Sequence, residues 1–133
     1  MAVALQASEG VLVARYLQYM LEFMAKRGVS GQNLLADTGL NADELRNHPD
    51  YLVSLPAFLR TMENLHRLDT SPTLSLELGA TLTIGSHGFL GYAVQASPNL
   101  AEALLLVNRY AQTRTQLIQI NFLTAGDFVA LEI

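Results

Sequence analysis

The spacing of the apolar residues changes once along this chain, close to residue 115. Before that point, apolar residues recur at intervals of three and four between glycine- and proline-containing breaks, as they do in amphipathic helices. After it, segments 116–122 and 128–133 alternate apolar and polar residues, which is the period of a half-buried strand. The sequence therefore predicts an α+β fold that is mostly helical, with about six helices, followed by a C-terminal β-hairpin.

Capping residues indicate where the individual helices begin. Asn41 stands three residues before Glu44, the spacing of a capping box. Ser54 precedes an amphipathic segment that runs to Leu68, and Ser86 is expected to cap a helix at 87–96. The predicted helices cover residues 9–27, 54–68, 87–96 and 99–114, with shorter ones after Ser30, from Asn41 to the break at His48-Pro49-Asp50, and from Ser71-Pro72 to Leu82; Tyr51-Leu52-Val53 is predicted to be extended.

The predicted hairpin turns at residues 124–127 and ends at Ile133. An isolated two-stranded hairpin is only marginally stable in water. We therefore expect a larger sheet, of which residues 1–133 hold a truncated part. The length of 133 residues is that of one domain.

Charge and composition exclude several classes of protein. The chain has eight Lys+Arg against twelve Asp+Glu, and it has no cluster of cations that would bind phosphates. We therefore expect that this chain does not bind nucleic acid by itself. No apolar run reaches the roughly 18 residues of a membrane span. The absence of cysteine excludes disulfides and agrees with a cytoplasmic location.

Neither a metal site nor a catalytic site is predicted. His48, His66 and His87 lie far apart, and none belongs to a recognised ligand pair at helical spacing. Asp43 and Glu44, near His48, are interpreted as residues of a helix start. Gly85-Ser86-His87-Gly88 lacks the spacing of a nucleophile elbow. No cofactor-binding motif is present, so we expect neither an enzyme nor a cofactor.

Three glycines, Gly85, Gly88 and Gly91, repeat every third residue. This spacing places them on one side of a helix start, where another backbone can approach closely. The approaching group is either a neighbouring segment of the chain or a small ligand or partner. We favour packing within the chain.

The passage from Leu78 to Tyr110 reads LGATLTIGSHGFLGYAVQASPNLAEALLLVNRY. It resembles the N-terminal, arabinose-binding-type effector-sensing domain of AraC-type bacterial transcription regulators. The matching Gly-Phe-Leu-Gly-Tyr-Ala and Leu-Ala-Glu-Ala-Leu segments are interpreted as scaffold. The resemblance is densest between residues 78 and 110 and weak before residue 50.

The resemblance implies a regulatory function for residues 1–133 as a single N-terminal domain. Such a domain binds a small-molecule effector, here of unknown class, and forms a homodimer in the cytoplasm. DNA would be bound only through a C-terminal helix-turn-helix domain that this sequence does not contain. No membrane partner is implied.

Candidate effector-binding residues come from the residue types themselves, because the resemblance transfers none. Ligand pockets are mostly apolar with a few directed polar groups. Arg60, His87, Tyr92, Arg109 and Tyr110 are the polar side chains selected on this basis. Arginine can bind a carboxylate through two parallel hydrogen bonds.

Two other functions remain open. Helix 99–114 has a wide apolar face formed by Leu100, Ala103, Leu104 and Val107, which would suit a dimerisation or interaction module without a ligand. His87 could serve as the general base of a small enzyme, although the sequence shows no nucleophile or orienting acid for it.

Overall fold

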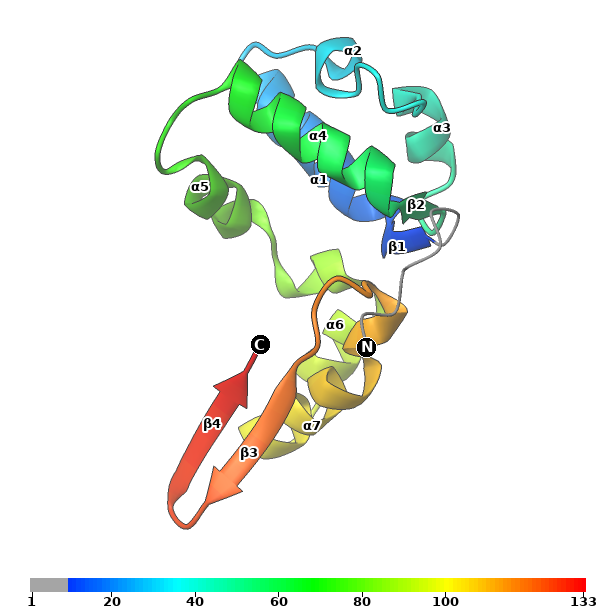
Figure 1. Ribbon diagram of the computed structural model, residues 1–133. Helices are drawn as coiled ribbons and strands as arrows, with labels where there is room; N and C mark the ends of the chain where they lie inside the picture. The colour runs from blue at the N-terminus through cyan, green and yellow to red at the C-terminus, as the bar shows by residue number, and fades with distance from the viewer. Residues whose placement is uncertain (1–9) are drawn as a thin grey trace, which may run out of the picture. The chain divides into compact units, whose positions relative to one another are not determined.

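The chain folds as two units that divide after Leu82. The computed structural model describes residues 10–133 (Figure 1). The first unit contains β1 Gly10–Val13, α1 Ala14–Lys26, α2 Gly31–Leu34, α3 Ala42–Asn47, β2 Leu52–Ser54, α4 Leu55–Leu68 and α5 Leu74–Thr81. The second contains the 3-10 helix η1 Ile84–His87, α6 Phe89–Gln95, α7 Leu100–Tyr110, the 3-10 helix η2 Ala111–Thr113, β3 Asn121–Ala125 and β4 Phe128–Glu132. The predicted α+β class, mostly helical with a C-terminal hairpin, is confirmed.

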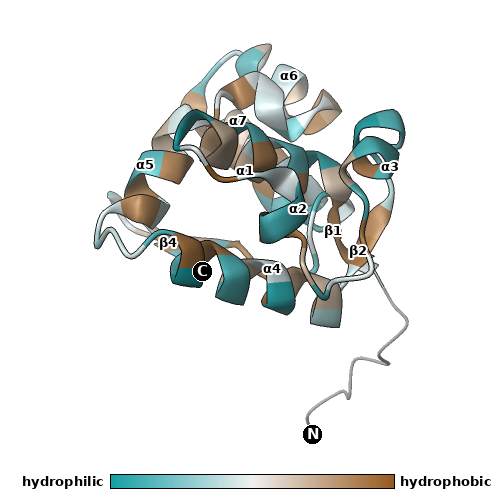
Figure 2. Ribbon diagram, turned by 90° about the horizontal axis from the view of Figure 1, so that it is seen from above, coloured by the Kyte–Doolittle hydropathy of each residue, from teal (hydrophilic) through white to brown (hydrophobic). Residues whose placement is uncertain are grey.

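The core of the first unit joins four of its helices. Met24 of α1, Leu34 of α2, Leu65 of α4 and Leu74 of α5 form one buried cluster. Figure 2 shows hydrophobic and hydrophilic residues alternating along α4, as expected for a helix with one face on this core. Burial of large aliphatic side chains is the main favourable contribution to folding, so this cluster holds the helices together.

Most of the predicted caps are confirmed. The side chains of Ser30, Asn41 and Ser54 each accept a hydrogen bond from a backbone N–H in the first turn of the following helix. Asn99 caps α7 in the same way. The prediction for Ser86 is wrong. Gly88 precedes α6, and Ser86 instead belongs to η1, so the helix predicted at 87–96 begins only at Phe89 and ends at Gln95.

The predicted helix at 9–27 begins later than expected. Residue 9 lies outside the described residues, and Gly10–Val13 forms strand β1, which pairs antiparallel with β2. Val11, Leu12 and Val13 are all buried. A short, continuous apolar run fits a buried strand as well as a helix, and the pairing with β2 decides between them. The predicted extended segment at 51–53 is confirmed as β2 at Leu52–Ser54.

A buried amide in α4 connects this helix to the segment that follows α2. The Asn64 Nδ2 atom donates hydrogen bonds to the carbonyls of Leu34 at 3.0 Å and Ala36 at 2.8 Å. Its Oδ1 atom accepts a hydrogen bond from Arg67. Since buried carbonyls need partners, Asn64 fixes the path of the chain between α2 and α3.

Arg27 joins three parts of the first unit at the end of α1. Its guanidinium forms ion pairs with Asp69, which follows α4, and with Glu77 of α5, and it lies 5.3 Å from the centre of the Phe23 ring. The hydrogen bond from Arg27 and one from the Ser71 N–H lower the pKa of Asp69. Hydrogen bonds from the Thr73 hydroxyl and from Arg27 lower the pKa of Glu77.

We expect the stability of the first unit to fall in acid, and to fall less when Arg27 is replaced. A carboxyl whose pKa is lower in the folded state stabilises the fold when ionised. This contribution is fully present above the ordinary pKa values, which are 3.8 for Asp69 and 4.5 for Glu77. It is lost as the pH falls through the lowered pKa values of the folded state. Urea unfolding between neutral and acidic pH would show a smaller acid loss for Arg27→Met. Lys26→Met, which removes a neighbouring cation, should keep the wild-type loss; equal pH dependence of all three proteins would contradict the assignment.

In the second unit, the backbone of Ile84 occupies the space that a side chain at position 91 would need. A Cβ atom on Gly91 would lie 1.7 Å from the carbonyl oxygen of Ile84, so α6 can follow η1 in this way only with glycine there. Packing within the chain, the interpretation favoured from the glycine spacing, is confirmed at this position. Gly88 has a φ of 62°, a conformation that other residues adopt rarely.

The hairpin is confirmed, but its first strand lies further along the chain than predicted. β3 begins at Asn121, and Ala125 pairs with Phe128, which leaves Gly126-Asp127 as a two-residue loop. Gly126 has a φ of 60°, and Asp127 is not in the positive-φ region. Glycine with positive φ at the first loop position is typical of a type II′ turn, and this short turn sets the strand register.

Candidate functional site

A hollow of about 280 Å³ lies beside α3 in the first unit. We call it the α3 hollow. A second, more open hollow of about 360 Å³ adjoins it and shares two lining residues, His48 and Tyr51. The α3 hollow is lined by Gly39, Leu40, Asn41, Glu44, Leu45, His48 and Tyr51, and the second one by Asn47, His48, Pro49, Asp50 and Tyr51.

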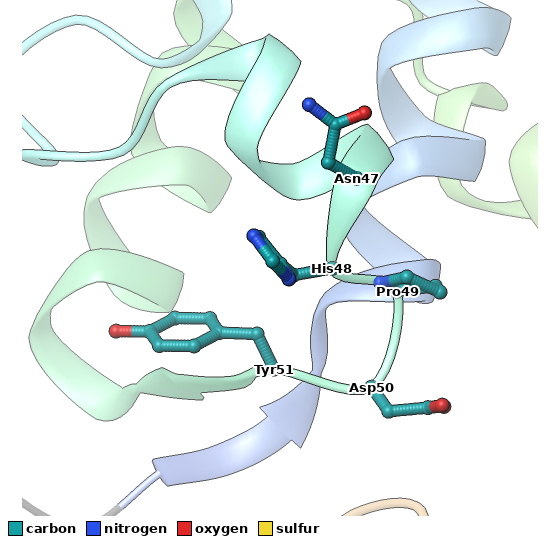
Figure 3. Close-up of a pocket in the computed structure, with 5 residues that line it drawn as sticks. All are labelled: Asn47, His48, Pro49, Asp50 and Tyr51. Carbon is teal, nitrogen blue, oxygen red and sulfur yellow. The ribbon is translucent and has the colours of Figure 1, made fainter.

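The polar side chains of the segment 47–51 point in two different directions (Figure 3). Figure 3 shows the His48 imidazole and the Tyr51 ring extending on the same side of the chain, whereas Asp50 points away from them. His48 and Tyr51 are both solvent-exposed. An imidazole and a phenol therefore face the same region of solvent, where both can donate or accept hydrogen bonds.

Backbone hydrogen bonds to the start of α1 hold this segment in place. The Ala14 N–H donates to the carbonyl of Tyr51 at 2.8 Å, and the Arg15 N–H donates to that of Pro49 at 2.9 Å. The first N–H groups of a helix have no partner within the helix, and Val13 provides no side-chain cap for α1. The segment 49–51 serves as that cap, which positions His48 and Tyr51 firmly.

α3 is anchored at both of its ends. The Asn41 side chain accepts hydrogen bonds from the N–H groups of Asp43 at 2.8 Å and Glu44 at 3.4 Å. Near the other end, the Gln18 side chain of α1 donates to the carbonyl of Leu45. The α3 hollow thus has a wall whose position depends on α1.

The predicted effector-binding residues are divided between the two units. Arg60 lies in the first unit, exposed on α4, where its guanidinium forms an ion pair of 3.0 Å with Glu63. His87, Tyr92, Arg109 and Tyr110 lie in the second unit. Arg109 and Tyr110 are exposed on the last turn of α7.

Two of the predicted residues, His87 and Tyr92, lie at the turn 85–88, and Arg114 also approaches this turn. A Cβ atom on Gly85 would lie 3.7 Å from the Tyr92 hydroxyl oxygen, and one on Gly88 would lie 3.3 Å from the Arg114 guanidinium. His87 stands between these glycines in sequence and ends η1. Burial, and secondarily the positive charge of Arg114, lower the pKa of His87. This cation was not among the predicted residues.

Arg114 has buried Nε and Nη2 atoms, which is unusual for a guanidinium. Sequence reasoning missed it because it is the last residue of the predicted helix 99–114 and belongs to no spaced motif. It also missed Glu44, His48 and Tyr51 as lining residues. The break at His48-Pro49-Asp50 was the available indication, but a break alone does not show that a hollow forms beside it.

The part of the chain that the structure describes offers no cage for a metal ion. Within residues 10–133, no three His, Cys, Asp or Glu side chains are grouped closely enough to share one. None of the helices described there combines the length and hydrophobicity required to cross a lipid bilayer.

Comparison with known proteins relates this chain to regulators. The family described as the N-terminal arabinose-binding domain of AraC transcription regulators matches residues 28–133, which include the α3 hollow and the 85–88 turn. The ornithine utilization regulator of Pseudomonas aeruginosa is 34% identical over 95 residues. That alignment covers 71% of this chain but only 28% of the relative.

Proposed function

Because this chain belongs to the family of N-terminal arabinose-binding domains of AraC transcription regulators, we propose that it binds a small-molecule effector and thereby controls a DNA-binding domain. The observation that carries this proposal is the family match over residues 28–133. The hollow beside α3 supports it, because pockets with a few polar groups are where small ligands bind.

The proposed mechanism is a shift between two arrangements of the regulator. An effector can shift this equilibrium only through a difference in its affinity for the two arrangements. In the full-length regulator, we propose that the shift repositions paired helix-turn-helix units on promoter half-sites. The proposal includes a homodimer in the cytoplasm and no catalysis by this chain, since the family is one of transcription regulators.

The named relative suggests the first compound to test. L-Ornithine should head a screen of amino acids, sugars and aromatic acids, because the relative is named a regulator of ornithine utilization. A ligand at 100 times its dissociation constant stabilises a protein by roughly 2.7 kcal/mol, which a thermal melt detects. The expected result is at least one compound that raises the melting temperature and also changes promoter binding by a full-length regulator containing this chain. Identical promoter binding with and without every compound would contradict the sensing function.

A second candidate function is dimerisation without a ligand. Several large apolar side chains of α6 and α7 are exposed, among them Phe89, Leu100 and Leu105. Exposed apolar groups of this kind are typical of protein–protein contacts. Sedimentation of the chain at increasing concentration tests this function. A dimer that forms without any ligand and is unaffected by the screened compounds would favour it over sensing.

A further inference from the structure

The sequence around the α3 hollow carries more negative than positive charge. Asp37, Asp43, Glu44 and Asp50 lie within residues 37–51, where Arg46 is the single Lys or Arg. The Arg46 guanidinium lies 2.9 Å from the Asp43 carboxylate, so its charge is already paired. Glu44 lines the hollow, and among the described residues no cation forms an ion pair with it.

Glu44 is also not used to cap its own helix. In a complete capping box, the third helical residue accepts a hydrogen bond from the backbone N–H of the cap residue. Thr83 and Ser86 form such a reciprocal pair in η1. At α3, the Asn41 side chain accepts a hydrogen bond from the Glu44 N–H. Among the described residues, the reciprocal bond from the Asn41 N–H to the Glu44 carboxylate is not made. This carboxylate is therefore available to a ligand.

The other lining residues supply apolar contacts. Leu45 is 2% exposed and Leu40 is partly buried, whereas the Tyr51 ring and the His48 imidazole are open to solvent. Leucine side chains can contact the methylene groups of a short aliphatic chain. An aromatic face attracts an ammonium group through its quadrupole. The lining thus combines an anionic group with apolar and aromatic surface.

The volume and charge of the α3 hollow restrict the class of ligand. At about 280 Å³ it suits a small metabolite. The excess of carboxylates in this segment would repel an anion. A bare metal ion is not favoured, because within residues 10–133 no set of three ligating carboxylate, imidazole or thiol side chains is present.

We propose that the α3 hollow binds a small aliphatic amine, with the ammonium group paired to the Glu44 carboxylate and the carbon chain against Leu40, Leu45 and Tyr51. This assignment rests on the sensing function proposed above, for which it names a site and a ligand class. An ammonium donates up to three hydrogen bonds, and a charge-assisted bond to a carboxylate is among the stronger ones in proteins.

The test is calorimetric titration of the chain with putrescine as the diamine probe, n-butylamine as a monoamine and succinate as an anion of similar length. The amines are expected to bind and succinate is not. Glu44→Gln keeps the side-chain shape and removes the charge, and it should weaken putrescine binding roughly tenfold or more. Glu22→Gln is the matched control, since it removes the same charge from an exposed position on α1. Thermal melts verify that both variants fold.

Each outcome decides the assignment. Loss of putrescine binding in Glu44→Gln, with retention in Glu22→Gln, supports the site. Equal binding by both variants, or no binding of either amine to the wild-type chain, overturns it. A compound that changes promoter binding by the full-length regulator equally in wild type and Glu44→Gln would leave the sensing function standing and reject the α3 hollow as its site. If no compound changes promoter binding, the sensing function itself fails.

Discussion

The Gly91→Ala variant is expected to lose the ordered packing of η1 against α6. The added Cβ would lie 1.7 Å from the carbonyl oxygen of Ile84 and 2.8 Å from its carbonyl carbon. Both are backbone atoms, so a rotamer change cannot relieve the contact and the two segments must move apart. Overpacking of well-packed sites costs about 1–3 kcal/mol and sometimes more, and we expect the upper part of that range. Hydrogen exchange of residues 84–95 should show the loss of protection.

Gly79→Ala is the matched control for this change. Gly79 is also a helical glycine, in α5, but a Cβ there would meet no atom within 4 Å. Alanine is favoured over glycine in a helix interior by up to about 1 kcal/mol, so this variant should be neutral or slightly stabilised. Unchanged hydrogen exchange of residues 84–95 in Gly91→Ala would show that the close approach to Ile84 does not constrain the second unit.

The Leu65→Ala variant is expected to destabilise the first unit by about 2–5 kcal/mol, the usual cost of removing a large aliphatic side chain from a core. Leu65 is 0% exposed and belongs to the buried cluster with Met24, Leu34 and Leu74. The variant loses the transfer free energy of the removed atoms and leaves a cavity between helices. Urea unfolding followed by far-ultraviolet circular dichroism measures the change.

Leu59→Ala provides the comparison within the same helix. Leu59 is 50% exposed, so its replacement leaves no closed cavity and should cost well under about 1 kcal/mol. Both variants change the intrinsic helix propensity of α4 equally. If Leu59→Ala and Leu65→Ala were equally destabilised, the cluster around Leu65 would not be the main core of the first unit.

Local chemistry allowed much of the fold to be predicted from the sequence. Ser30 and Ser54 cap their helices as expected, because the bond from a side-chain oxygen to an N–H three residues later depends only on the local sequence. Alternation predicted the existence of the hairpin, but it placed the first strand at 116–122, whereas β3 covers Asn121–Ala125. Strand β1 was not predicted, because Gly10–Val13 becomes a strand through pairing with β2, which lies some forty residues away in sequence.

The candidate site was less predictable for the same reason. Histidine, tyrosine and glutamate are common surface residues, and although Glu44 and His48 are four residues apart, the sequence does not show that they line one hollow with Tyr51. That arrangement depends on carbonyls of the segment 49–51 capping α1. Arg60, by contrast, was selected for its residue type, and the structure places it in an exposed ion pair with Glu63. The five residues selected from the sequence remain a prediction about effector contacts.

The Asn64 amide has a mechanical consequence for the α3 hollow. Two carbonyls of the segment 34–36 are bonded to one nitrogen of α4, so a sliding or rotation of this helix pulls that segment with it. The segment leads directly into Gly39 and Leu40, which line the α3 hollow. Any displacement of α4 that keeps both hydrogen bonds would therefore also move the chain that enters the hollow.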